Sequence, residues 1–419
     1  MAAASTSIKW YRSTFFNITI LGLCNFAAPG IWGAMNSLGA GGAQKPYLVN
    51  TANALTFSLM VVSCLLSSAL VRLIGIKGAL IFGTLGYAPY AAGLYTNNRF
   101  GTEWLVILGA ALCGISAGVF WMAEAAIAIA YPEPWNKGKA LGYWLTFRVS
   151  GQILGGAINL GLNSSRSEAG KVSYAVFLVF IALQCLAPAG ALFLTPPEKV
   201  QRQDGKKVEL GIFNNPWFEI KATIRLFFSR KFLLLLLLIG QAVYAEAVFF
   251  TYLSLWFSVR SRALGSFLSG IIAAIGGNIL GIYILDNLDS ARSMVDMGNS
   301  FGAGFAVYVF LLLGFQLNYM FLYFIIQNLA DSQEQVIRYS ALLRGTESAW
   351  QAISYGLGSI EIMAQVGNIY LNFGLWAAAI VPAWLVLRHI GVAKPADGED
   401  SEHSVSEPGD AKIAGAVTN

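Results

Sequence analysis

The chain has 419 residues, of which 56% are hydrophobic and only 12% are charged, and its formal net charge is +5. Too few polar side chains remain to cover a soluble globule of this size, and the long apolar runs are continuous, unlike the alternating strands of a membrane β-barrel. The positive charge is spread over loops, which implies no nucleic-acid partner. The composition predicts an all-α polytopic membrane protein whose main partner is membrane lipid.

Eleven runs are long enough to cross the hydrocarbon core, which takes about 20 residues. Six precede a polar central segment, near residues 14–37, 48–71, 79–96, 104–130, 139–162 and 173–194. Five follow it, near 231–257, 263–285, 301–330, 341–365 and 368–388. We expect an N-terminal bundle over 1–194, a linker over 195–230, a C-terminal bundle over 231–390 and a disordered tail over 391–419.

Positive residues gather in the loops on one side of the first six spans. The largest group lies in the linker and at the start of the next span and comprises Lys199, Arg202, Lys206, Lys207, Lys221, Arg225, Arg230 and Lys231. Because positive loop residues stay in the cytoplasm, we expect the linker and the N-terminus there. The linker stretch PWFEIKATIRLFFSR fits a helix lying in the membrane interface, and it fits a solvated connector with one amphipathic turn equally well.

Two charged residues lie inside the fourth and fifth spans, on either side of a short polar hairpin. With a rise of about 1.5 Å per residue, Glu124 and Arg148 both lie roughly 10 to 14 Å from that hairpin. A charge at membrane depth needs a partner, so we expect the two to pair. The pair would either gate a pathway or respond to protons, or it would be a static structural bridge.

Further polar residues suggest an internal repeat. Arg148 and Gln152 are four residues apart, and Glu347 and Gln351 have the same spacing in the equivalent helix of the second half. Gln327 precedes that helix as Glu124 precedes the other. Arg148 and Glu347 could therefore meet between the halves, although a chance match explains the pattern equally well.

The remaining sites are single residues. Asn25 and Asn36 flank Pro29 and Gly30, where the first helix could break. Asn163 opens a glycosylation triplet, but it abuts a helix end and we expect it to be unmodified. No nucleophile with a base partner, metal cluster or phosphate loop is found, and the two histidines lie at the last helix end and in the tail. We therefore expect no enzyme, no metal and no cofactor.

Several stretches have the order and spacing of a known family. They are RSTFFNITILGLCNFAAPGIWGAMNSLGAGG, PYLVNTANAL, GIKGALIFGTLGYAPYAAGLY, RVSGQILGGAINLGLN and RYSALLRGTESAWQAISYGLGSI. Together they resemble the fungal branch of the Unc-ninety-three-like family of the major facilitator superfamily. The resemblance implies a twelve-helix, two-bundle fold around a central cavity. It also implies that helix seven lines the cavity, which makes Glu246 a candidate for cation or proton coupling; a hydrated carboxylate at the outer mouth is the competing interpretation.

The function that the resemblance implies is secondary transport of a small molecule or ion by alternating access, with proton coupling as an option. Because the family includes regulators of ion channels and a trafficking chaperone, the alternative is a non-transporting partner of another membrane protein. The segment DNLDSARSMVDMGNS stands where a ninth helix would be expected. We expect helix nine to be missing, which would put the tail opposite the N-terminus and favours the alternative. The buried charges favour the transporter.

Overall fold

A computed structural model describes residues 8–274, apart from 40–41, 43–45, 169 and 209–215, together with residues 333–388 and parts of 309–329. The segment of the expected helix nine, Gln327 and the tail lie outside the described residues. Seven helices within the described part are long and apolar enough to cross a membrane. The other expected spans correspond to α6, α10 and α13, which carry polar residues, and to the partly described residues 301–330.

The described residues of the N-terminal half form seven α-helices. They are α1 (Thr14–Asn25), α2 (Ile31–Asn36), α3 (Tyr47–Leu85), α4 (Tyr87–Phe100), α5 (Trp104–Ala130), α6 (Lys137–Asn163) and α7 (Tyr174–Ala191). A π-helical turn over Phe26–Gly30 joins α1 to α2 and contains Pro29, whose missing N–H group interrupts the helical hydrogen bonds. The first span is therefore one helix over Thr14–Asn36, and at the position of the expected break it contains a π-helical turn.

The second and third expected spans are joined without a loop. α3 continues for 39 residues and turns at Gly75, whose φ of 73° favours glycine. The stretch LVRLIGIKG, which separates these spans in the sequence, is therefore helical on both sides of one glycine kink.

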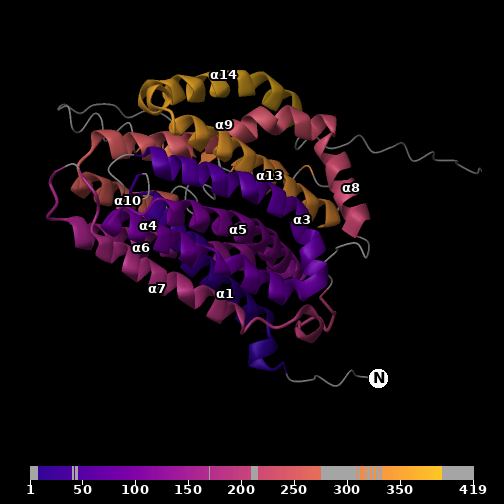
Figure 1. Cartoon of the computed structure of the whole chain (residues 1–419). Helices are drawn as coiled ribbons and strands as arrows, with labels where there is room; N and C mark the ends of the chain where they lie inside the picture. Colours follow the sequence, from indigo (N-terminus) through magenta and orange to yellow (C-terminus); the bar gives the residue numbers. More distant parts are fainter. Residues whose placement is uncertain are drawn as a thin grey trace, which may run out of the picture.

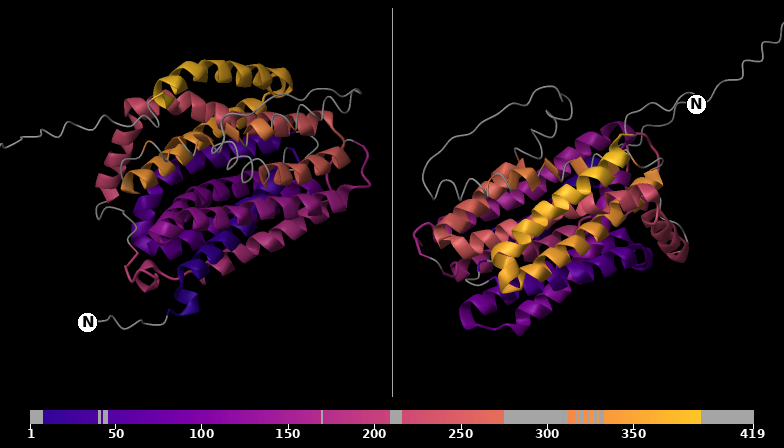
Figure 2. Two further views of the ribbon diagram at one scale, coloured as in Figure 1. Left: turned by 180° about the vertical axis from the view of Figure 1, so that it is seen from behind. Right: turned by 90° about the horizontal axis from the view of Figure 1, so that it is seen from above.

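The second half begins with α8 (Pro216–Phe227) and continues with α9 (Arg230–Trp256), α10 (Val259–Ala274), α13 (Gln333–Gly358) and α14 (Asn368–Leu387). Ser229 caps α9, because its side chain accepts a hydrogen bond from the Phe232 backbone N–H. Most helices run along one common direction, whereas α8 runs across them at one end (Figure 1). The two further views keep α8 at that same end (Figure 2).

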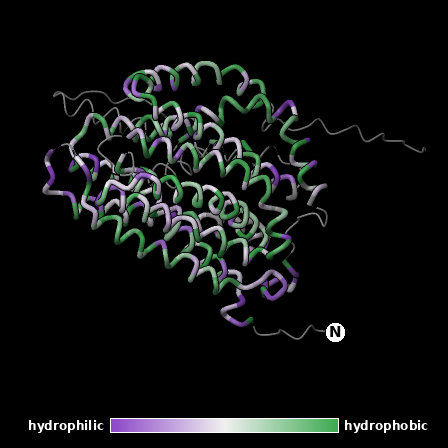
Figure 3. Tube along the Cα trace, viewed as in Figure 1, coloured by the Kyte–Doolittle hydropathy of each residue, from purple (hydrophilic) through white to green (hydrophobic). Residues whose placement is uncertain are grey.

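The two halves pack through the pairs α3–α13 and α6–α10. Glycines allow the second approach, since a Cβ atom at Gly156 would lie 2.6 Å from the Phe267 Cα and one at Gly270 would lie 2.8 Å from the Ile153 N. The glycine-rich sequence of α6 therefore serves close helix packing. Hydrophobic residues run along the helices, and hydrophilic ones gather toward the two ends of the bundle (Figure 3).

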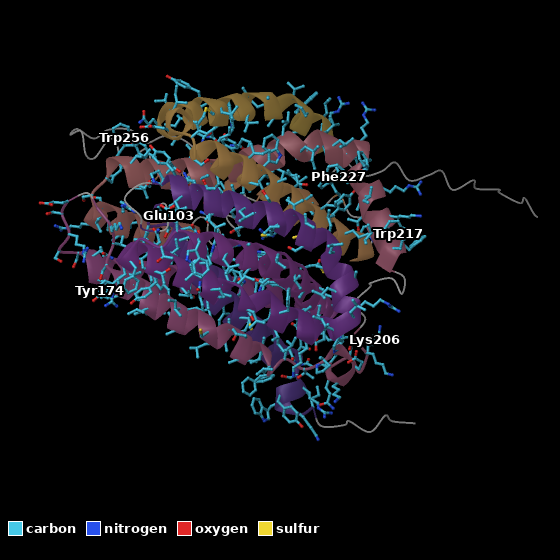
Figure 4. All side chains as sticks on the ribbon, in the orientation of Figure 1. Glu103, Tyr174, Lys206, Trp217, Phe227 and Trp256 are labelled. Atoms are coloured by element: carbon cyan, nitrogen blue, oxygen red, sulfur yellow. The ribbon has the colours of Figure 1, made fainter. Side chains whose placement is uncertain are left out.

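One end of the bundle, here called the linker end, holds the start of α1 and residues 195–208. There the Tyr131 hydroxyl donates to the Thr195 carbonyl at 2.9 Å. Phe232 at the start of α9 stacks on Tyr339 near the start of α13, and Leu387 at the end of α14 packs on the same cluster. α13 thus starts, and α14 ends, at the linker end, as the twelve-helix plan requires. The odd number of spans in the sequence predicts the tail on the side opposite to the N-terminus, and the structure corrects that expectation. Lys206, Trp217 and Phe227 lie at the linker end, whereas Tyr174 and Trp256 lie at the opposite, far end (Figure 4).

Candidate functional site

A cavity of about 130 Å³ lies between the two halves and is lined by residues of both. Its charged and amide side chains come from α6, α9 and α13 and comprise Arg148, Gln152, Glu246, Arg344, Glu347 and Gln351. Its aromatic side chains comprise Trp32, Phe57, Tyr87, Trp121, Phe249, Phe250 and Phe315. The structure therefore brings together five of the residues singled out in the sequence: Arg148, Gln152, Glu246, Glu347 and Gln351. It adds Arg344 and the aromatic wall.

Glu347 and Arg344 form an ion pair within α13, with 2.9 Å between Oε2 and Nη1. The guanidinium carbon of Arg344 also lies 4.2 Å from the ring centroid of Trp121 on α5. The guanidinium carbon of Arg148, from the N-terminal half, lies 5.0 Å from the same centroid. One indole ring is thus shared by a cation from each half, which is a favourable arrangement because the ring face attracts positive charge.

Glu246 faces the cavity from α9, where its carboxylate accepts a hydrogen bond from the Gln351 side-chain amide. This position is in the central cavity, where the Glu246 side chain is partly exposed. The hydrogen bond joins α9 to α13 within the C-terminal half. Any change in the charge of Glu246 would act directly on the packing of these two cavity helices.

Glu124 has a different partner from the one that its depth suggested. Its Oε1 accepts a hydrogen bond of 2.6 Å from the Trp144 indole N–H, and Oε2 has no hydrogen-bond partner. The residue is 1% exposed and does not line the cavity. Among the described residues no ion pair joins Glu124 to Arg148, although the Arg148 charge is near enough to act on the carboxylate. Trp144 lies one helical turn before Arg148 on α6 and donates its indole N–H to the Glu124 carboxylate, whereas Arg148 lies against Trp121.

The three asparagines singled out in the sequence lie away from the cavity. Both polar side-chain atoms of Asn25 are buried and have no hydrogen-bond partner among the residues that the structure describes. Asn36 accepts a hydrogen bond from Asn53 at 3.0 Å, and Asn53 accepts one from the Tyr90 hydroxyl at 2.6 Å. Asn163 is buried, and its side-chain amide donates a hydrogen bond to the Asn159 carbonyl.

The far end of the bundle is closed by an arginine that sequence reasoning missed. Arg262 on α10 is 1% exposed. Its Nε donates to the Leu38 carbonyl at 2.8 Å, its Nη2 to Gly39 at 2.9 Å and its Nη1 to Gly170 at 3.1 Å. All three acceptors belong to loops of the N-terminal half. Gly39 has a φ of 74°, and a Cβ there would lie 2.7 Å from the Phe250 carbonyl oxygen, so this contact needs glycine.

Side-chain hydrogen bonds reinforce this closure. The hydroxyls of Ser37 and Ser266 lie 2.7 Å apart, and the Asn159 amide donates to the same Ser266 oxygen at 2.7 Å. Asn50 donates to the Thr251 hydroxyl at 3.1 Å. Each bond joins one half to the other, so opening the far end requires several of them to break.

No group of three potential metal ligands among histidine, cysteine, aspartate and glutamate occurs in the described part of the chain. The described carboxylates of the cavity are held by Gln351 and Arg344. A cavity lined by both halves in this way is suited to holding a small molecule between them.

Comparison with known proteins agrees with this architecture. The Major Facilitator Superfamily profile matches residues 13–367. The chain is 38% identical over 422 residues to the "Notoamide biosynthesis cluster protein O'" of Aspergillus versicolor, covering 92% of this chain and 91% of that protein. It is 27% identical over 444 residues to the UNC93-like protein 1 of Arabidopsis thaliana, covering 94% of each.

Two solved structures share the fold at low sequence identity. The D-xylose–proton symporter superposes with a TM-score of 0.58 at 12% identity, covering 89% of this chain and 96% of that one. The partially occluded inward-open xylose transporter XylE from E. coli gives 0.56 at 13% identity, covering 89% and 97%. These structures show the shared fold, and the family that the profile gives is one of transporters and not of enzymes. As its resemblance to the Unc-ninety-three-like proteins predicts, the chain belongs to the Major Facilitator Superfamily.

Proposed function

We propose that the chain is a secondary transporter that carries a small molecule by exposing the central cavity to the two sides of the membrane in turn. The observation that carries this proposal is the cavity itself, because residues of both halves line it and the far end is closed by bonds between those halves. Rocking of the halves would break these bonds and open the cavity on that side.

The lining supports a ring-containing organic substrate. Seven aromatic side chains surround the amides of Gln152 and Gln351, which can both donate and accept hydrogen bonds. The volume of about 130 Å³ is of the order that holds a benzene-sized molecule, so a larger substrate would enter only as the halves separate. The relative from a biosynthesis cluster supports a product or intermediate of biosynthesis as the substrate.

Glu246 is the coupling residue in this proposal. Protonation would remove the negative charge that strengthens its hydrogen bond with Gln351, and this would loosen α9 from α13. Proton movement would thereby be linked to the position of two helices that line the cavity.

The test is a deletion strain that carries the wild-type chain, Glu246→Gln or Glu361→Gln. Glu361 is an exposed carboxylate near a helix end and gives the matched control. We expect the wild type and the control to change the distribution of at least one ring-containing metabolite between cells and medium, and Glu246→Gln to abolish that change. Equal metabolite distributions in the deletion strain and the wild type would refute transport.

A second candidate is a non-transporting regulator or trafficking partner of another membrane protein. The UNC93-like relatives favour it, as does the absence of an acidic residue in the stretch LVRLIGIKG, where the superfamily has its gating motif. In that case, deletion would change the amount or location of another membrane protein, and the cavity variants would restore it as well as the wild type does.

A further inference from the structure

Helix α8 lies outside the membrane-crossing helices and touches both halves. It packs against α3 of the N-terminal half and against α13 and α9 of the C-terminal half, at the linker end of the bundle (Figure 1). α9 begins at Arg230, only three residues after α8 ends, and its apolar run starts at Phe232. α8 therefore lies at the level where the hydrocarbon core gives way to the headgroups.

The two faces of α8 differ in what they contact. Leu226 and Phe227 pack on the core cluster that contains Phe232 and Leu235. The opposite face exposes four large apolar side chains, with Trp217 at 62%, Phe218 at 58%, Ile224 at 45% and the following Phe228 at 66%. At 3.6 residues per turn Trp217, Ile224 and Phe228 lie on one side of the helix, and Phe218 lies about a quarter turn away at the edge of the same exposed arc.

Two basic side chains lie within the same arc. Lys221 and Arg225 are exposed and stand one turn apart. The Lys221 Nζ lies 5.5 Å from the Trp217 ring centroid, so the ammonium group lies beside an exposed indole. Arg230 and Lys231 continue the exposed positive charge into the start of α9. Aromatic rings interleaved with lysine and arginine are typical of surfaces that sit between phospholipid headgroups and acyl chains.

We propose that this face of α8 binds anionic phospholipid headgroups in the leaflet at the linker end. Trp217, Phe218, Ile224 and Phe228 enter the interface, and Lys221 and Arg225 contact the phosphates. Because α8 touches both halves, lipid bound to its exposed face would contact a helix that packs against both. The binding itself does not depend on transport.

The acidic C-terminal tail is the competing occupant. It contains Asp397, Glu399, Asp400 and Glu402, and it leaves α14 at the same end of the bundle, since Leu387 packs on the cluster beneath α8. Its carboxylates could meet Lys221 and Arg225. However, this acidic stretch has no large apolar side chain to cover the exposed rings of α8. The apolar face therefore favours lipid.

The experiment titrates purified full-length protein in detergent with phosphatidylglycerol or phosphatidylcholine and measures bound lipid by native mass spectrometry. We expect tighter binding of phosphatidylglycerol. The double variant Lys221→Gln, Arg225→Gln should weaken that binding by about fivefold for each charge removed and leave phosphatidylcholine unaffected. The matched control is Lys206→Gln, Lys207→Gln, two exposed lysines of the same linker outside α8, which should change neither. Trp217→Ser, Phe218→Ser should weaken both lipids.

Circular dichroism and unfolding temperature establish that each variant is folded. Unchanged phosphatidylglycerol affinity in the Lys221, Arg225 variant would overturn the proposal, as would equal affinity of the wild type for both lipids. Displacement of the lipid by inorganic phosphate would show a site for free anions instead. Neutralising Asp397, Glu399, Asp400 and Glu402 in the full chain should leave the affinity unchanged, and a large increase would show that the tail occupies the face.

Discussion

Arg262 offers the sharpest test of alternating access, because one side chain holds three loop carbonyls of the other half. The substitution Arg262→Gln removes the charge and shortens the reach of the side chain, so we expect at least two of the three bonds to be lost. A hydrogen bond that involves a charged group contributes about 1.5 to 3 kcal/mol net. The closed far end would thus lose about 3 kcal/mol or more, which raises the open population by a factor on the order of 100.

The assay uses Cys113, which lines the cavity and is 1% exposed. In a variant with Cys24, Cys64 and Cys185 replaced by alanine, a membrane-impermeant thiol reagent is applied to each face of oriented vesicles. The alkylation rate from the far-end face measures how often that end opens. We expect Arg262→Gln to raise this rate by a factor on the order of 100, or to saturation, and to leave the rate from the linker-end face unchanged or lower.

Arg260→Gln is the matched control, since the Arg260 side chain is exposed and its backbone N–H makes the contact to the Arg166 carbonyl. This variant should behave as the wild type does. If folded Arg262→Gln protein reacts at the wild-type rate from the far-end face, the far end is not held closed by Arg262, and the proposed role of these bonds is wrong.

Three other substitutions test the packing and charges of the site by thermal unfolding in detergent. Gly156→Leu places a side chain against the Phe267 backbone and should destabilise the protein by about 1 to 3 kcal/mol or more, whereas Gly161→Leu, with open space around its Cβ position, should cost far less. Trp144→Phe removes the hydrogen bond that the indole donates to Glu124 and should cost about 1.5 to 3 kcal/mol. Glu124→Gln in the same chain should restore most of this loss, and an equal loss in both proteins would contradict the bond. Arg344→Met leaves Glu347 buried without its ion-pair partner and should lower the free energy of unfolding by about 3 to 5 kcal/mol. The double variant Arg344→Met, Glu347→Met should lose less stability than this. A larger loss in the double variant would refute the ion pair.

Depth in the membrane could be read from the sequence, because a helix rises by a fixed distance for each residue. This is why Arg148, Gln152, Glu246, Glu347 and Gln351, all polar residues within apolar runs, are found around one cavity. The irregular turn at Pro29 and the close helix packing at the α6 glycines can also be predicted from the sequence, since both follow from the chemistry of single residues.

The rotation of each helix about its axis could not be read in this way. Glu124 and Arg148 lie at similar depth, but the rotations of α5 and α6 about their axes decide which residues they contact. The Glu124 carboxylate accepts a hydrogen bond from Trp144, and the Arg148 guanidinium lies over Trp121. Arg344 could have been noticed, since it stands three residues before Glu347 on one helical face. Arg262 had no such signal, because an arginine near the end of a span is typical of an interface anchor and its acceptors are backbone carbonyls of distant loops.

The positions of these two arginines bear on how the halves move. Arg262 joins the halves at the far end, whereas Arg344 reaches Trp121 on the side of the cavity nearer the linker end. Arg148 contacts the same indole from within the N-terminal half, so Trp121 keeps one cation when α5 and α13 separate. In the proposed cycle, opening the linker end would break the Arg344 contact together with the packing of α13 on α5, whereas opening the far end would break the Arg262 contacts and leave Trp121 with both cations. Each opening would then spare the other set of contacts, as the proposed alternating access requires.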